Sequence, residues 1–210
     1  MIRYRRLAKG DIESLGSLAL KAWSHAYRGI YAPSTIRRKV SQYYSTESIG
    51  ATLREARRGN SFFVVACDGE VLIGYANGGM IRNPWKNPSR SGGKVYRVSG
   101  WELQRIYLLP EYIGQGIGRE LLDRWERFLR AKRADRYYVT YNSKNRLARD
   151  FYSRNGFARA KELDDGISHC AVKRLSAQQT LGADKTDIQK SPNRARESQN
   201  HTFVTRMIGS

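Results

Sequence analysis

A glycine-rich loop between a predicted strand and a predicted helix constrains the fold of this chain more than any other feature. The loop, residues 110–119, reads PEYIGQGIGR. Residues 101–109 before it are rich in β-forming residues and stop at a proline, whereas residues 119–133 after it have apolar residues at helical spacing. Glycines let backbone N–H groups converge, and a helix N-terminus adds the positive end of its dipole. The order strand, loop, helix therefore predicts a cradle for a phosphate group.

The helix predicted at 119–133 is strongly amphipathic. Its apolar face consists of Leu121, Leu122, Trp125, Phe128 and Leu129. Its outer face pairs each acid with a base four residues later, in the pairs Glu120–Arg124, Asp123–Arg127 and Glu126–Arg130. We expect the apolar face to cover a sheet and the charged pairs to lie outside.

Known phosphate-binding motifs fit the loop only in part. A Walker loop ends in Gly-Lys-Ser/Thr, whereas this loop continues as Gly118-Arg119-Glu120. A dinucleotide-binding fingerprint needs a third glycine at the place that Arg119 occupies. The loop is also compatible with a tight turn that binds nothing. The loop alone therefore leaves the ligand open.

The rest of the chain predicts one mixed α/β domain over residues 1–175. The expected helices are 11–28, which Asp11 would cap, a region after Pro33, 46–58, and 144–155, which Gly156 would end. The expected strands are 2–7, 61–67, 71–81, 137–141, 157–163 and 167–175, with a type I′ turn at Asp68-Gly69. Residues 82–100 predict a loop with a strand piece at 95–98. The polar residues 176–210 predict a disordered tail.

The chain is strongly basic, with 38 Lys and Arg against 19 Asp and Glu and a net charge of +19. The tail holds five Lys/Arg and three Asp/Glu, so +17 belongs to the domain. A balance of this kind predicts an anionic partner or substrate. One alternative function is therefore a nucleic-acid- or ribosome-associated protein, although no nucleic-acid-binding motif accompanies the basic residues.

The sequence contains no recognisable targeting or membrane segment. The first residues, MIRYRR, lack the apolar core of a signal peptide, and no stretch approaches the ~20 apolar residues that span a bilayer. Cys67 and Cys170 lie in apolar runs without metal-binding spacing, so we expect two buried thiols. These features predict a cytoplasmic protein without a metal site.

Several motifs follow one another in a fixed order around the loop. They are LQRIYLLPEY at 103–112, the glycine loop, the amphipathic helix, and then Asn145, Ala148, Phe151-Tyr152 and Gly156-Phe157. This order resembles motif A and the following segment of the GNAT superfamily, and AWSHAYRGIY at 22–31 resembles the substrate-side helices of some members. The resemblance covers about residues 2–175. It implies an α/β (α+β) fold whose mixed, mostly antiparallel central sheet is splayed between two strands and flanked by helices.

The resemblance also implies an acyltransferase that moves an acetyl group from acetyl-CoA directly to a primary amine, with acetyl-CoA between the splayed strands. Backbone groups of Ile106, Tyr107 and Leu108 would pair with the pantetheine arm as an added strand would, and the Leu108 N–H would be the oxyanion donor. The other cofactor contacts would be Ile113, Gly114, Gln115, Gly116, Ile117, Gly118, Arg119, Asn145 and Ala148. The family usually has Gln or Arg where this chain has Ile113. Asn145 would also suit a helix N-cap.

Two side chains are candidates for proton transfer. Tyr152 is the candidate acid, because a phenol and a thiol have similar pKa values, although it also suits a packed core. Glu102 is the candidate base, directly or through water, and by the two-residue period it would share a face with Gln104 and Ile106. An exposed strand-end carboxylate is the alternative reading for Glu102. His25 is the weaker alternative base.

Trp23, Tyr27 and Tyr31 are the candidate contacts for the acceptor, although helical spacing places the first two equally well in the core. We expect the acceptor to be a primary amine of a small molecule or a protein. Polyamines fit the family but suit a domain of charge +17 only if the acceptor cleft is locally acidic. A CoA-binding regulator without turnover is a further alternative, and a homodimer is compatible with the sequence.

Overall fold

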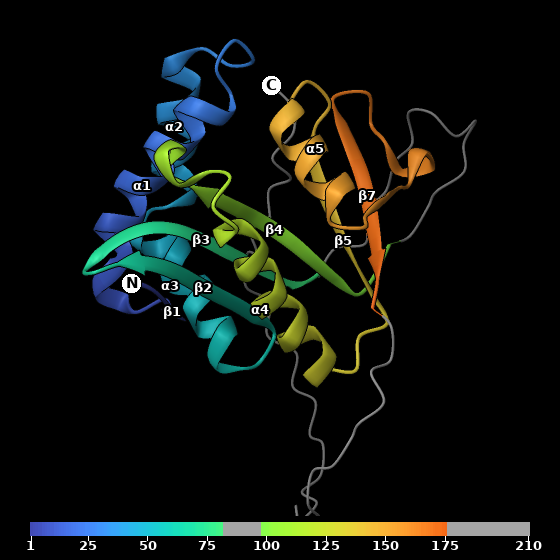
Figure 1. Cartoon of the computed structure of the whole chain (residues 1–210), viewed down its shortest axis with the longest axis horizontal. Coiled ribbons are helices and arrows are strands. Elements are labelled where there is room, and N and C mark those ends of the chain that lie inside the picture. The colour runs from blue at the N-terminus through green and yellow to red at the C-terminus, as the bar shows by residue number, and fades with distance from the viewer. Residues whose placement is uncertain (82–97, 176–210) are drawn as a thin grey trace, which may run out of the picture.

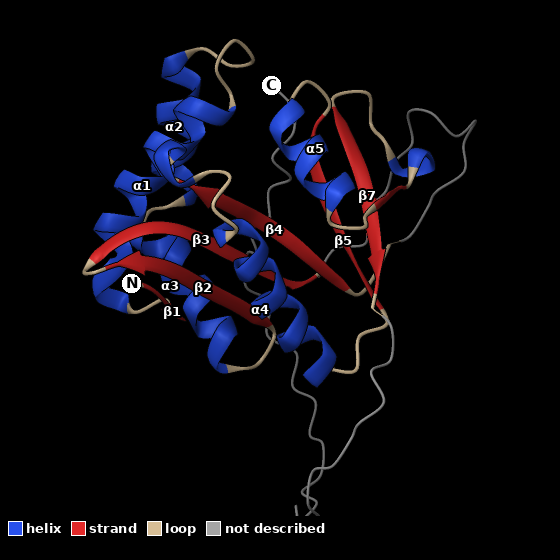
Figure 2. Ribbon diagram, viewed as in Figure 1, coloured by secondary structure: helices blue, strands red, loops and turns tan. Residues whose placement is uncertain are grey.

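One twisted sheet of seven strands forms the centre of the molecule (Figures 1 and 2). The computed structural model describes residues 1–81 and 98–175, so the predicted tail and, apart from Val98, the strand piece at 95–98 lie outside the described residues. The strand order is β1-β2-β3-β4-β5-β7-β6, and every neighbouring pair is antiparallel except β4 and β5. The strands are β1 Ile2–Arg6, β2 Ser61–Asp68, β3 Val71–Met80, β4 Trp101–Leu108, β5 Arg136–Asn142, β6 Ala158–Arg159 and β7 Ser168–Arg174.

Helices cover both faces of this sheet, which confirms the predicted mixed architecture. Helices α1, α2 and α3 lie on one face, whereas α4 crosses β2, β3 and β4 on the other (Figure 1). The bounds are α1 Ile12–Ala26, α2 Pro33–Tyr43, α3 Thr46–Arg57, α4 Ile117–Ala131 and α5 Arg146–Arg154. None of the helices in the described ranges is long and apolar enough to cross a membrane.

The helix after the glycine loop begins two residues earlier than predicted. Its first residue is Ile117 rather than Arg119, and Gly116 precedes it with a φ of 79°. Gly118 lies in the first turn with a helical backbone. The positive-φ conformation therefore ends at Gly116, whereas the sequence predicts a loop that extends through Gly118. The apolar face pairs with the sheet as predicted, and Leu121, Leu122, Trp125 and Leu129 are buried.

The first hairpin turn also differs from prediction by one residue. Asp68 still pairs with Val71 at the end of β2, so the turn consists of Gly69 and Glu70. Gly69 has a φ of 57°, which explains why a glycine is needed there. Asp11 likewise stands before α1 but gives it no side-chain cap.

The strand predicted at 157–163 is wrong for most of its length. Strand β6 has only two residues, and a 3₁₀ turn, Lys161–Leu163, follows it. The buried carboxylate of Asp164 accepts the N–H of Cys170 at 2.8 Å and pairs with the guanidinium of Arg159. These contacts fold the chain back onto β7, and a longer β6 would carry Asp164 away from both partners. Cys67 and Cys170 are buried free thiols, as predicted.

Candidate functional site

Strands β4 and β5 separate from each other halfway along their length. They are parallel neighbours only at Trp101–Tyr137, Glu102–Tyr138 and Leu103–Val139. From Gln104 onward they diverge, and Figure 1 shows the gap between them widening toward the glycine loop and α5. The two strands therefore splay apart beyond Leu103, and we call the region between their diverging ends the β4–β5 opening.

The backbone of β4 directs hydrogen-bonding groups into this opening. The N–H of Leu109 donates to the carbonyl of Ile73, at 2.8 Å, and so points toward β3. Because antiparallel residues alternate between bonding to one neighbour and facing the other, Leu108 and Ile106 face the opening. Tyr107 bonds toward β3, and its partly buried ring packs on Trp23 of α1.

The glycine loop lies at the wide end of the opening and presents a row of free donors. Gly114 and Gly116 have φ values of 89° and 79°, and a Cβ at either position would meet no atom within 4 Å. Among the described residues, no backbone acceptor takes the N–H groups from Gly114 to Arg119. Six consecutive N–H donors at the start of a helix form a site for an anion such as a pyrophosphate. The loop therefore fits the diphosphate of CoA.

The side chains around this loop leave it open. Ile113 is 44% exposed, and the Gln115 amide donates to the carbonyl of Glu111 at 2.8 Å. The Arg119 guanidinium binds Asp123 at 2.9 Å and Asn155 at 3.0 Å, so it points along α4. Ile117 is buried beneath the loop. The structure thus offers the loop's backbone rather than its side chains to a ligand.

Asn145 holds the start of α5 beside the opening. It is the N-cap, is only 4% exposed, and its side-chain oxygen accepts the N–H of Ala148 at 3.0 Å. The capping role that the residue type suggested is confirmed. Its proximity to Tyr27 helps to hold the phenol pKa of Tyr27 down, although burial raises that pKa to about 12 overall.

Tyr152 on α5 is buried against the end of β5. Its ring packs on Tyr141 and Phe157, and the hydroxyl makes no hydrogen bond with any described residue. Burial raises the pKa of Tyr152 well above that of a free phenol, and the nearby Tyr27 and Glu102 add to the shift. Tyr152 therefore keeps its proton at neutral pH, and α1 and β4 both approach it at the opening.

Glu102 does not share a face of β4 with Ile106, contrary to the prediction. Trp101 packs on Trp125 of α4, so its neighbour Glu102 points to the α1–α2 face. The register with β3 shifts between Asn77 and Gly78, so Gln104 is an extra residue in β4, which puts Ile106 back on the α4 face. The prediction that Glu102 and Ile106 share a face is therefore wrong. The carboxylate accepts a hydrogen bond from the Thr140 hydroxyl at 3.2 Å, across the β4–β5 pair.

The three predicted acceptor contacts lie at different depths. Trp23 is buried in the core against Tyr44 and Tyr107. The Tyr27 hydroxyl is hydrogen-bonded to that of Tyr107 at 2.9 Å. Tyr31 accepts a hydrogen bond at 3.1 Å from an amide at the end of β5, so it bridges the two sides of the opening. Tyr31 is the most accessible of the three.

Sequence reasoning missed two residues that border the opening. Asn142 supplies the amide that binds Tyr31, and Thr140 is the partner of Glu102. Both follow the two-residue alternation of β5, and this alternation was the available sequence signal. His25, the alternative base, lies on α1 and its imidazole bonds to no described residue.

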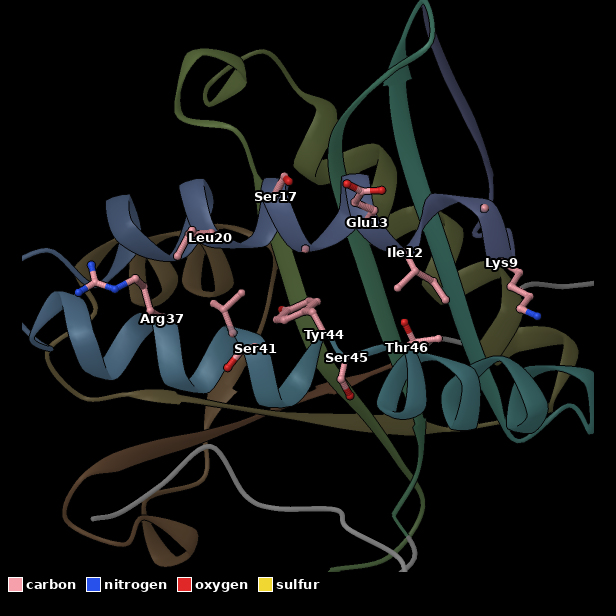
Figure 3. Close-up of a pocket in the computed structure, with 13 residues that line it drawn as sticks. Lys9, Ile12, Glu13, Ser17, Leu20, Arg37, Ser41, Tyr44, Ser45 and Thr46 are labelled. Atoms are coloured by element: carbon pink, nitrogen blue, oxygen red, sulfur yellow. The ribbon is translucent and has the colours of Figure 1, made fainter.

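A second hollow lies away from the β4–β5 opening. It is a groove of about 760 Å³ between α1 and the α2–α3 pair, and Lys9, Glu13, Arg37 and Tyr44 are among its lining residues (Figure 3). None of the predicted site residues lines it. Within the described ranges, no group of three or more His, Cys, Asp or Glu could hold a metal ion.

Comparison with known proteins agrees with this geometry. The model of the acetyltransferase (GNAT) family matches residues 21–157. The spermidine N(1)-acetyltransferase of Thermoplasma acidophilum is 29% identical over 160 residues, which are 74% of this chain and 88% of that protein. The crystal structure of the PaiA N-acetyltransferase from Thermoplasma acidophilum in complex with coenzyme A has a TM-score of 0.71 and 26% identity, over 83% of this chain and 99% of that one.

A more distant structure shares the fold alone. The GNAT-family acetyltransferase from Staphylococcus aureus has a TM-score of 0.62 at 18% identity, and the match covers 84% of this chain and all of the other. The family model extends over more than half of the chain and includes the glycine loop, Asn145 and Tyr152. The chain belongs to the acetyltransferase (GNAT) family and is an acetyl-CoA-dependent N-acetyltransferase.

Proposed function

We propose that the chain binds acetyl-CoA in the β4–β5 opening and transfers its acetyl group to a primary amine that enters from the α1–α2 face. The observation that carries this proposal is the row of N–H groups from Gly114 to Arg119, at the wide end of the opening, for which the described residues supply no backbone acceptor, together with the β4 backbone that is not paired with β5 beyond Leu103. A phosphate-bearing, extended ligand satisfies both sets of donors.

Each part of this site has a role in the proposal. The loop holds the pyrophosphate, the backbone of Ile106 and Leu108 pairs with the pantetheine arm, and Asn145 and Ala148 complete the edge beside α5. The Leu108 N–H then lies where the thioester oxygen gains charge. Acetyl-CoA supplies the activated acetyl group, and the fold supplies its position relative to the amine.

Proton transfer falls to Glu102 and Tyr152. A C–N bond forms as the amine attacks the acetyl carbon, and the C–S bond breaks. The nitrogen loses a proton to Glu102, directly or through water, and the sulfur gains one from Tyr152. Glu102 lies on the face from which the amine enters, and Tyr152 keeps a proton at neutral pH because burial raises its pKa.

The acceptor is proposed to be a small-molecule amine. The Thermoplasma acidophilum relative is named for acetylation of spermidine. Tyr31 contacts both the Tyr27 ring and the Asn142 amide at the opening, and these apolar rings with one amide suit contact with an aliphatic amine. A protein N-terminus is the competing acceptor and belongs in the same assay.

The test measures release of free thiol when purified chain is mixed with acetyl-CoA and single amines, including a peptide. We expect thiol release that depends on both enzyme and amine. We also expect acetyl-CoA to stabilise the folded chain by about 2.7 kcal/mol at a hundred times its Kd. Stabilisation without thiol release for any amine would contradict the proposed reaction and indicate a CoA-binding protein without turnover.

A further inference from the structure

The guanidinium of Arg105, on the acceptor side of β4, has no hydrogen-bonding or ion-pair partner among the described residues. It lies two residues beyond the last β4–β5 pair, on the same face as Glu102. Its Nε is buried without a hydrogen-bond partner, and the side chain forms no ion pair with any residue in the described ranges. Buried donors normally have acceptors, so this one points to a group that the described residues do not supply.

Two tyrosines hold this guanidinium in place. Arg105 lies 5.0 Å from the ring centroid of Tyr44 and 5.7 Å from that of Tyr43. Tyr44 is itself fixed, because its hydroxyl accepts from the indole of Trp23 and bonds to Tyr75. Stacking on two anchored rings orients the planar guanidinium, which is the arrangement that favours bidentate binding of an anion.

The walls around Arg105 carry positive charge. Between Glu13 and Glu47 the sequence has five Lys and Arg and no acid, and this stretch forms most of α1 and all of α2. Lys39 lies 5.9 Å from the ring centroid of Tyr31, and Arg38 acts on the Tyr43 hydroxyl together with Arg105. Among the described residues of α2 and β4, Glu102 is the only carboxylate. A polyamine would need several carboxylates here.

We propose that Arg105 and its tyrosine neighbours form an anion-binding subsite beside the reacting amine. On this basis the preferred acceptor is a primary amine that also carries a carboxylate or a phosphate. The inference rests on the proposed function, because it assigns a substrate class to the same opening. Glu102 receives the amine end and Arg105 the anionic end, so the two charges of β4 orient the acceptor.

The test compares acceptors that share one carbon chain. Butylamine, 4-aminobutyrate and putrescine present the same amine with a methyl, a carboxylate or an ammonium at the far end. Ethanolamine and phosphoethanolamine form a second pair, which distinguishes phosphate from carboxylate as the anionic group. We expect kcat/KM from thiol release to be at least tenfold higher for the anionic member of each set than for the others.

Substitution at Arg105 tests whether its guanidinium causes the preference for anionic amines. Arg105→Gln should raise KM for the preferred anionic amine about 10- to 100-fold with little change in kcat, and should leave butylamine unchanged. Arg105→Lys should restore part of the loss. The matched control is Arg124→Gln, which removes an arginine that stacks on Tyr4 at 4.6 Å, on the far face of the sheet.

Three outcomes separate the inference from the function on which it rests. Equal or better use of putrescine or butylamine would overturn the anionic acceptor and leave the acetyltransferase reaction intact. An equal loss for all amines in Arg105→Gln, with normal acetyl-CoA binding, would make Arg105 a structural residue and overturn the subsite. Absence of thiol release with every amine would overturn the proposed function itself.

Discussion

The paired end and the splayed end of strands β4 and β5 differ in whether their side-chain and backbone groups contact the protein or stay available to a ligand. At the closed end, where the strands are paired, Trp125 of α4 is fully buried and packs on both Trp101 and Tyr137. At the open end the strands diverge, and the start of α4 presents backbone N–H groups that have no backbone acceptor among the described residues. Most groups at the closed end hold the molecule together, although the buried indole N–H of Trp125 has no hydrogen-bond partner among the described residues, whereas the open end leaves a row of backbone N–H groups for a ligand.

A buried carboxylate on α4 collects several hydrogen bonds at the closed end. Glu126 of α4 is 2% exposed and accepts a hydrogen bond from the Tyr137 hydroxyl at 2.7 Å. The ammonium of Lys173 and the guanidinium of Arg130 bind the same carboxylate. Glu126 therefore ties α4 to β5 and β7, and it keeps the two halves of the sheet together below the point at which they part.

The largest effect is expected from Glu126→Ala. The substitution leaves Lys173 and the Tyr137 hydroxyl buried without their acceptor, so the free energy of unfolding should fall by about 3–5 kcal/mol. Urea denaturation measures the change. Glu120→Ala is the control, because Glu120 pairs with Arg124 and Arg127 at the surface and should cost at most about 1 kcal/mol. An equal loss of unfolding free energy in Glu126→Ala and Glu120→Ala would contradict the stabilising role assigned to Glu126.

Tyr152→Phe should separate chemistry from binding at the open end. Loss of the proton donor should lower kcat about 100-fold, because general acid catalysis contributes on that scale. The free energy of unfolding and the Kd for CoA should stay the same, since the hydroxyl bonds to no described residue. Steady-state kinetics and calorimetry provide the two readouts. An unchanged kcat would remove Tyr152 from the acid role.

Gly116→Ala should weaken the cradle itself. The φ of 79° strains an alanine, and the new methyl projects into open space beside the free N–H groups, so the Kd for CoA should rise about tenfold. Gly69→Ala is the matched control, with a φ of 57° and equally open surroundings in the β2–β3 turn. Both variants should lose about 1–2 kcal/mol of stability. If Gly69→Ala weakened CoA binding as much, the loop would have no special role.

The smallest effect concerns pH. Burial raises the pKa of Tyr152 from its ordinary value of 10.0, so the folded protein retains this proton when an unfolded chain would lose it. Deprotonation of Tyr152 should therefore cause no loss of activity up to about pH 9.5. The free energy of unfolding should begin to fall through this residue only above about pH 10. Rate profiles between pH 7 and 9.5 check the first statement. A fall in kcat below pH 9 that Tyr152→Phe abolishes would contradict it.

The open end was more readable from the sequence than the closed end. Its loop, its terminating proline and the cap at Asn145 depend on local backbone rules, and these features lie within one continuous segment. The helix start at Ile117 was still two residues off, because nothing in the sequence shows which glycine leaves the helical conformation.

Contacts between residues far apart in the sequence explain why the predictions for Glu126 and Glu102 were wrong. Glu126 was expected on the outer face with Arg130, but its partners Tyr137 and Lys173 lie 11 and 47 residues away. Gln104 is an extra residue in β4 that puts Glu102 and Ile106 on opposite faces, and a bulge of this kind has no marker in a run of strand-forming residues. Both errors arise from pairing between elements rather than from propensity within one.

Amide hydrogen exchange with and without saturating CoA tests the central claim most directly, because it reports on the backbone donors themselves. The structure predicts slower exchange on CoA binding at residues 114–119 and at Ile106 and Leu108. Residues 136–139 at the closed end should exchange at the same rate in both states. Unchanged exchange at residues 114–119, or protection confined to the groove between α1 and α2, would contradict the assignment of the β4–β5 opening as the acetyl-CoA site.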